Sequence, residues 1–191
     1  MTPPRPPSFR RGPRRAGDPG QVEIFVADEQ ADVEVDNGRY AELAARVLED
    51  EGVRGDIEFA LLFVDEATMA ELNSTHMGRR GPTDVLAFPI DQVLLRGGRM
   101  PDASRNGPPR RDPPAVDGPI LLGDVVVCPS VARRNSVEHG VTVTSELDLL
   151  VVHGILHVLG MDHREPGETA AMKAREQMHL AAFAAARGED Q

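Results

Sequence analysis

The sequence contains little aromatic side-chain material and a single thiol: 4% of its 191 residues are aromatic, tryptophan is absent, and Cys128 is the one cysteine. One cysteine excludes an internal disulfide framework, and its place in the apolar run VVVCP predicts a buried thiol without catalytic function. No run of about 18 apolar residues exists, and the first twenty residues lack the apolar segment of a signal peptide. These absences predict a cytoplasmic protein that does not enter a membrane.

The charge is also unbalanced, with 21 basic against 31 acidic residues and a net charge of -10. Five arginines and one aspartate fall in residues 1–20, so the rest of the chain is more acidic than the whole. This argues against a protein that coats nucleic acid nonspecifically. If the chain handles a polyanion, arginines or a bound metal ion must concentrate positive potential locally.

Twelve of the 16 prolines lie in two segments. Residues 1–20 have almost no core-forming side chains, which predicts a disordered arm rich in proline and arginine. Residues 97–119 are too rich in proline and glycine for a helix or strand, which predicts a flexible surface insertion. The remainder of residues 21–187 is then a single domain, as the length favours.

Hydrophobic periodicity predicts an α+β fold in which a roughly four-stranded mixed sheet packs with about five helices. β-branched and apolar runs predict strands at 22–27, 57–64, 84–89 and 120–128, the last apolar enough for an interior position. Capping residues and apolar stripes predict five helices: one after Asp36, one after Asp65, one over 129–139, one from Thr144 or Ser145 through Val158, and one from Glu165 to Ala186.

The segment VVHGILHVLGMDH holds three of the six histidines within eleven residues. His153 and His157 are four residues apart, so a helix places both on one face, where two imidazoles can reach one metal ion. His163 cannot join them on the same helix, because it would lie on another face and further along the axis. Gly160 supplies a left-handed residue at which the chain can turn back and bring His163 to the other two.

The alternative is that these are core histidines, which would be the better interpretation for any one alone. Burying three unpartnered imidazoles costs about 1–3 kcal/mol for each unmatched group, whereas one metal ion satisfies all three. Three histidines with a fourth position for water match a catalytic zinc site, so we expect one zinc ion per chain. The ligands would also accept nickel or copper.

These residues resemble the signature of the YbeY-type endoribonucleases, or rRNA maturation factors, which is His-Gly-x-x-His-x-x-Gly-x-Asp-His. The resemblance extends to LNSTHMGRRGPTDVLAFP at 72–89 and LLGDVVVCP at 121–129. It implies a zinc-dependent endoribonuclease of the bacterial cytoplasm that cuts single-stranded RNA. The implied roles are rRNA processing, 16S rRNA 3′-end maturation and ribosome quality control. The implied partners are single-stranded RNA, 16S rRNA on the small ribosomal subunit, and ribosomal proteins.

The middle motif departs from the family at one position. Many members carry an arginine four residues after the asparagine, thought to hold or activate the scissile phosphate, where this chain has Met77. The resemblance then implies that a neighbour, Arg79 or Arg80, supplies the positive charge. The alternative is that both arginines belong to a solvated turn before Gly81.

Two aspartates are candidates to orient a ligating imidazole by accepting its second N–H. Asp162 is adjacent to His163 and is shared with the family motif, while Asp124 is a charge within a buried strand run. For Asp124, the alternative is a bulge or a strand end. Thr83 and Asp84 either line the cleft or only cap a turn. The other histidines, His76, His139 and His179, lack partners at metal-binding spacing and are expected at the surface.

Two other functions remain open. The histidine spacing is that of the metzincin metalloproteases, but the glutamate that follows their first histidine is here Gly154, which cannot act as a base. The second of these alternatives is a non-enzymatic ribosome-assembly factor that uses zinc structurally. Cleavage of RNA, casein or neither by the metal-loaded protein distinguishes the three.

Overall fold

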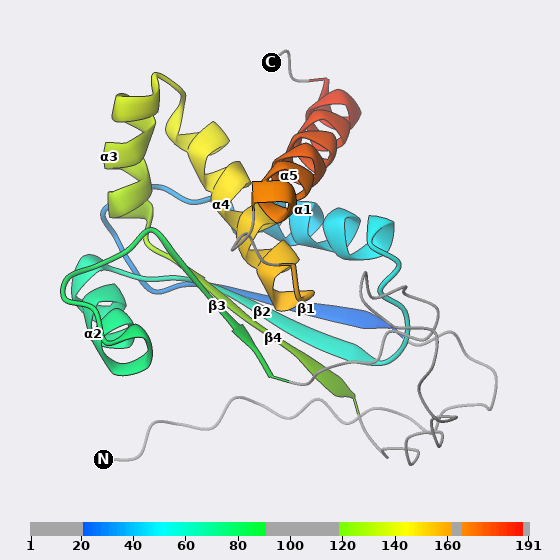
Figure 1. Ribbon diagram of the computed structural model, residues 1–191, viewed down its shortest axis with the longest axis horizontal. Helices are drawn as coiled ribbons and strands as arrows, with labels where there is room; N and C mark the ends of the chain where they lie inside the picture. The colour runs from blue at the N-terminus through cyan, green and yellow to red at the C-terminus, as the bar shows by residue number, and fades with distance from the viewer. Residues whose placement is uncertain (1–20, 91–118, 162–165, 189–191) are drawn as a thin grey trace.

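The computed structural model of the chain describes residues 21–90, 119–161 and 166–188. The predicted arm, residues 1–20, lies outside the described residues, as does the predicted insertion, 97–119, apart from its last residue. The described residues form four strands and five helices, in an α+β arrangement with the sheet between a large helical layer and one separate helix (Figure 1).

The sheet is mixed and four-stranded, as the sequence predicts. Its order is β1-β2-β4-β3, with β4 in an interior position. The first three strands in this order are parallel, and β3 pairs antiparallel with β4. The strand bounds are Val22–Asp28 for β1, Ile57–Phe63 for β2, Val85–Pro89 for β3 and Ile120–Val127 for β4.

The helices follow the predicted capping signals closely. Asp36 and Asp65 each accept a hydrogen bond from a backbone N–H of the first turn that follows. The fourth helix is the exception, because Thr142 and not Thr144 or Ser145 caps it, with its hydroxyl accepting from Ser145 N. The bounds are Asn37–Asp50 for α1, Glu66–Met77 for α2, Pro129–His139 for α3, Val143–Val158 for α4 and Pro166–Arg187 for α5.

The main core lies between one face of the sheet and the layer formed by α1, α4 and α5, while α2 packs on the other face near one end (Figure 1). Helix α4 is central, because its apolar side chains fill this core. Ten of its residues are buried, including the apolar Val151, Val152, Ile155 and Leu156. A helix buried on most sides is rigidly held, so side chains on its remaining face are fixed in position.

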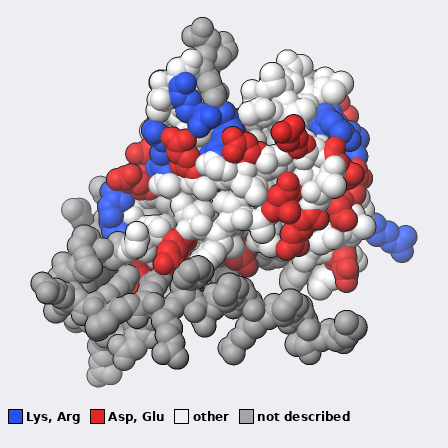
Figure 2. Space-filling model, turned by 180° about the vertical axis from the view of Figure 1, so that it is seen from behind, with Lys and Arg blue, Asp and Glu red and all other residues white. Residues whose placement is uncertain are grey.

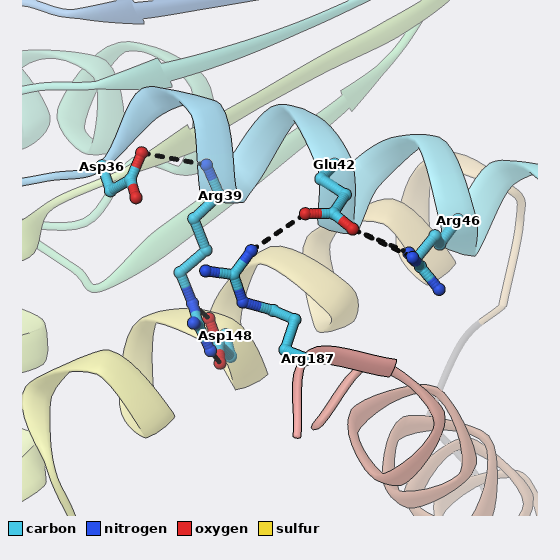
Figure 3. A network of polar contacts seen from close by, with 6 residues as sticks. All are labelled: Asp36, Arg39, Glu42, Arg46, Asp148 and Arg187. Carbon is cyan, nitrogen blue, oxygen red and sulfur yellow. Dashed lines mark hydrogen bonds and ion pairs between the residues drawn. The ribbon is translucent and has the colours of Figure 1, made fainter. Parts of the chain in front are cut away.

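Ion pairs tie α1 to the two helices that carry the candidate site (Figure 3). Arg39 of α1 makes a bidentate pair with the buried Asp148 of α4, at 3.0 and 2.6 Å. Glu42 of α1 accepts a hydrogen bond from Arg187 of α5 at 2.9 Å. These pairs fix how α4 and α5 lie on α1.

Cys128 is fully buried, as predicted, and burial raises the pKa of its thiol. Among the described residues, no single helix has both the length and the apolar character needed to span a membrane. Only α3 and α4 taken together meet those limits, and they are bent by 114°.

Candidate metal centre

His153 and His157 lie one turn apart on α4, on the one side of the helix that the core leaves partly open. Their Nε2 atoms point toward each other and are 3.1 Å apart. The ring centroids are 4.5 Å apart, and the ring planes meet at 80°. The predicted i, i+4 spacing therefore brings two imidazole nitrogens to one point.

Glu176 of α5 holds the other side of the His153 ring. Its Oε1 lies 2.7 Å from His153 Nδ1, and the residue is 8% exposed. With the proton on Nδ1 donated to this carboxylate, Nε2 of His153 carries its lone pair toward His157. Sequence reasoning missed Glu176, which is 23 residues from His153 along the chain.

The predicted turn after α4 is present. Gly160 has a φ of +88°, in the left-handed region that glycine occupies without strain. His163 and Asp162, which the sequence predicts as a ligand and its neighbour, lie outside the described residues. Within the described ranges, no three His, Cys, Asp or Glu side chains are grouped to hold a metal ion.

The two described histidines fit the donor set that the sequence predicts. Two Nε2 lone pairs at one point would repel each other, unless one nitrogen carries a proton or a cation lies between them. A carboxylate on the far nitrogen of a ligating imidazole is the usual partner that fixes ring orientation in metal sites. His153 and His157, with Glu176 behind, can therefore supply two ligands to a zinc ion.

Gly154, next to His153, lies where α4 packs closely against the sheet. A Cβ added there would lie 2.6 Å from Val125 Cγ1 and 3.1 Å from Val125 Cγ2. A glutamate at this position would therefore collide with β4 and would point at the sheet rather than toward the histidines. This packing gives a physical reason for the absence of the metzincin base.

A cavity of about 260 Å³ adjoins His153, between α4, α5, the C-terminal end of α3 and the start of β3. Its polar wall includes His153, Glu176 and four other ionisable side chains, which are Asp84, His139, Glu146 and Lys173. Its apolar wall is formed by Val85, Leu149, Leu150 and Met172. His153 therefore borders a recess that can accept part of a substrate.

The loop after α2 carries the predicted arginines. Asn73 is buried, and its side-chain Nδ2 donates to Gly81 O at 2.8 Å. Its backbone carbonyl oxygen accepts a hydrogen bond from Arg79 N. Arg79 and Arg80 are exposed, and no side-chain partner for either appears in the described part of the chain. The structure shows no contact between them and the two histidines, and Met77 is exposed at the end of α2.

The structure does not bring Asp124 to the described histidines. Alternate residues of β4 face opposite sides of the sheet, and Val125 packs beneath Gly154 of α4. Asp124 therefore faces the α2 side, where burial raises the pKa of its carboxyl. The pairing of β2 with β4 also shifts near this point. Glu58 pairs with Leu121 and Phe59 pairs with Gly123, so β4 contains one extra residue at a bulge.

Asp84 combines the two roles that the sequence left open, because it lines the cavity and also ends a turn. Its Oδ1 accepts from Val85 N and from the Thr83 hydroxyl, and its Oδ2 accepts from Asn135 of α3. Both carboxylate oxygens therefore hold β3 and α3 in place.

Of the three histidines predicted at the surface, His76 and His139 are exposed and His179 is not. His179 is 2% exposed, because α1 packs over it and Glu51 accepts from its Nε2 at 2.6 Å. The sequence prediction for His179 was wrong, since its partner comes from a helix 128 residues away.

Comparison with known proteins shows which proteins this chain resembles. A sequence profile for a family described as Endoribonuclease YbeY matches residues 25–184. A protein of that name from Salinispora tropica is 40% identical over 166 residues, covering 87% of this chain and 99% of its own. Another, from Thermobifida fusca, is 42% identical over 151 residues, covering 79% of this chain and 87% of its own.

The fold also resembles the solution structure of TM1509 from Thermotoga maritima. The TM-score is 0.51 at 24% identity, with 85% of this chain and 90% of the other covered. At this identity the likeness supports the fold alone.

Proposed function

This chain belongs to the YbeY family of endoribonucleases, and from that membership we propose that it is a zinc-dependent enzyme that cuts single-stranded RNA. The observation that carries the zinc assignment is the approach of His153 Nε2 and His157 Nε2 to 3.1 Å, with Glu176 on the far nitrogen of His153. His163 is the proposed third ligand. One zinc ion per chain is the proposed cofactor.

A zinc ion held there would supply Lewis acidity to a phosphodiester oxygen and lower the pKa of a coordinated water. The protein's own contribution is to fix the ligands. Glu176 accepts the Nδ1 proton of His153 and so keeps the Nε2 lone pair directed at the ion. Helix α4 holds His157 in position, because the opposite face of the helix is packed in the core.

Positive charge for the RNA backbone is assigned to Arg79 and Arg80. The acidic body makes such local charge necessary, because RNA would otherwise be repelled. Figure 2 illustrates this, since lysines and arginines on the face shown do not form a continuous band and carboxylates lie between them. The loop that Asn73 braces carries these two arginines and continues to Asp84, which lines the cavity.

The wider biological role follows from the resemblance. The proposed substrate is 16S rRNA on the small ribosomal subunit, in rRNA processing, 3′-end maturation and ribosome quality control. Ribosomal proteins are proposed as additional partners, and the bacterial cytoplasm as the place of action.

Zinc content and cleavage specificity test this proposal together. Full-length protein loaded with zinc is incubated with single-stranded RNA, with double-stranded RNA and with casein, and a chelator serves as control. We expect about one zinc per chain and cleavage of single-stranded RNA alone. Arg79→Ala and Arg80→Ala should slow cleavage without changing zinc content, because they remove positive charge near the phosphate and not a ligand.

The other two functions give distinct results in the same assay. Cleavage of casein and not RNA would indicate a metalloprotease. Stoichiometric zinc with cleavage of neither substrate would indicate an assembly factor that uses the ion structurally.

A further inference from the structure

We propose that the cavity beside His153 is a subsite for one base of the RNA, and that Glu146 recognises an amino group of that base. The inference rests on the proposed function, because it assigns a place to the substrate's base. It adds a recognition residue outside the histidine motif.

The cavity adjoins His153, one of the two histidines of the pair. His153 and Glu176 line one end, and Glu146 and His139 line the other. Glu146 precedes His153 by seven residues on the same helix, which is two turns or about 10 Å. A group bound at Glu146 is therefore too far away to be the phosphate at His153, but the separation suits the base of a nucleotide attached to that phosphate.

Glu146 is buried but still has hydrogen-bonding capacity. It is 3% exposed, and its Oε2 lies 2.9 Å from His139 Nδ1. No partner of its Oε1 appears in the described part of the chain. In the same part of the chain, no side-chain oxygen is sealed from solvent without a hydrogen bond. Oε1 is therefore accessible, and the space that it faces is the cavity that Glu146 lines.

The other two carboxylates of the cavity support neighbouring groups. Asp84 accepts three hydrogen bonds from its surroundings, and Glu176 accepts from His153 and so supports the histidine pair. Glu146 is the cavity carboxylate that has an uncommitted oxygen and does not contact the histidine pair. His139 holds its other oxygen and so fixes the orientation of the group.

The chemistry of the walls selects a base rather than a phosphate. In the cavity as a whole, Asp84, Glu146 and Glu176 outnumber Lys173, so an anion away from the histidine pair is disfavoured. Leu149, Leu150 and Met172 offer apolar contact to a flat ring. Single-stranded RNA is commonly recognised by bases that turn out of the stack and hydrogen-bond along their edges.

A carboxylate accepts hydrogen bonds and donates none, so it discriminates between bases. Cytosine presents an exocyclic amino group, to which Glu or Asp is a suitable acceptor. Uracil has a carbonyl oxygen at the same ring position, which a carboxylate repels. The subsite should therefore prefer cytosine to uracil.

Nucleotide titrations followed by NMR test the preference. CMP and UMP carry the same phosphate, so their affinity ratio for the full-length protein isolates the base. We expect CMP to bind about tenfold more tightly, as one hydrogen bond to a charged acceptor supports. Glu146→Gln should reduce the ratio to about two, because an amide both donates and accepts. Glu138→Gln, the same change at an exposed position of α3, should leave the ratio unchanged.

A second arm needs no protein variant, in case Glu146→Gln does not fold. CMP methylated twice on its exocyclic nitrogen has no N–H to donate, and it should bind the native protein as weakly as UMP does. Equal affinity for CMP, its dimethylated form and UMP would overturn the subsite.

Cleavage assays separate this inference from the proposed function. RNA cleavage with no preference between cytosine and uracil next to the cut would refute the subsite and leave the endoribonuclease intact. A CMP preference that depends on Glu146, in a protein that cuts no RNA, would refute the endoribonuclease and leave the subsite intact.

Discussion

Helix α5 carries two residues that form short histidine–carboxylate pairs, and the two pairs differ in what surrounds them. Glu176 pairs with His153 of α4 at 2.7 Å, and His179 pairs with Glu51 at the end of α1 at 2.6 Å. The His153 side chain is 27% exposed, whereas the His179 side chain is 1% exposed. Similar hydrogen bonds therefore occur in an open and in a sealed environment.

The two histidines differ in what lies near their second ring nitrogen and near the paired carboxylate. His153 turns its second nitrogen toward His157, and its side chain also lines a cavity. His179 has Asp50 3.7 Å from its second nitrogen, and Arg175 also binds Glu51. Burial would raise the pKa of Glu51, but hydrogen bonds from Arg175 and His179 outweigh it and the pKa is lowered. His179 also lines a cavity, of about 400 Å³, but a carboxylate faces each of its two nitrogens. A histidine enclosed by charged partners holds helices together, while one with a second nitrogen directed at another imidazole can share a metal ion with it.

Removing either histidine of the open pair should have the largest effect. His153→Ala and His157→Ala should each lose most of the bound zinc and reduce RNA cleavage on the order of a thousandfold, because a ligand is lost. Elemental analysis and single-turnover cleavage measure both. His76→Ala, at an exposed histidine, is the matched control. Full zinc content and full cleavage in His157→Ala would show that the open pair is structural.

Removing the histidine of the sealed pair should reverse the pattern. His179→Ala leaves a buried gap between α1 and α5 and removes one partner of Glu51. We expect a loss of about 3 kcal/mol in the free energy of unfolding, measured by chemical denaturation. RNA cleavage at a temperature where the variant stays folded should equal that of the native protein. A cleavage defect without a stability defect would contradict the distinction between the pairs.

Glu176 tests whether the carboxylate of the open pair tunes the imidazole or only packs beside it. Glu176→Gln keeps the shape but offers a weaker, neutral acceptor to His153. The expected loss is about 10- to 100-fold in zinc affinity or cleavage rate, as for other carboxylates that support a ligating histidine. Glu71→Gln, at an exposed position of α2, provides the control. Unchanged zinc affinity would reduce Glu176 to a packing residue.

The local features of this molecule could be predicted from its sequence. Strand alternation, capping residues and the i, i+4 histidines depend on neighbours along the chain, so the four strands, five helices and the His153–His157 pair were all predicted. Gly160 adopts the expected left-handed conformation for the same reason. The arm at 1–20, the insertion at 97–119 and the ligand His163 stay predictions, since they lie outside the described residues.

Features that depend on distant partners could not be predicted in the same way. His179 is buried by Glu51, and nothing near either residue in the sequence indicates the other. One signal was available, however. On α5, the positions 172, 176, 179 and 183 form one helical stripe, in which Glu176 and His179 stand between the buried Met172 and Phe183. Polar residues within an apolar stripe predict buried partners on neighbouring helices.

The smallest expected effect concerns a third pair, His139 with Glu146, whose histidine is the most exposed of the three and whose carboxylate is the least exposed. Its His139 side chain is 57% exposed, while Glu146 is buried. The hydrogen bond to Glu146 is the main cause that raises the pKa of His139, with the charges of Glu146, Glu138 and Asp84 adding to it. The cavity also places Lys173 and Glu176 of α5 at this wall.

The sign of the pH dependence follows from that raised pKa. Below the unfolded value of about 6.5, the imidazole is protonated in both states and the pair contributes fully to stability. As pH rises through the raised folded pKa, the proton leaves and the contribution is lost. The difference in melting temperature between the native protein and His139→Gln should therefore shrink with rising pH, and high salt should diminish it because the imidazole is exposed. A difference that grows with pH would mean that neutral His139 is the stabilising form, and would place this pair with the sealed one.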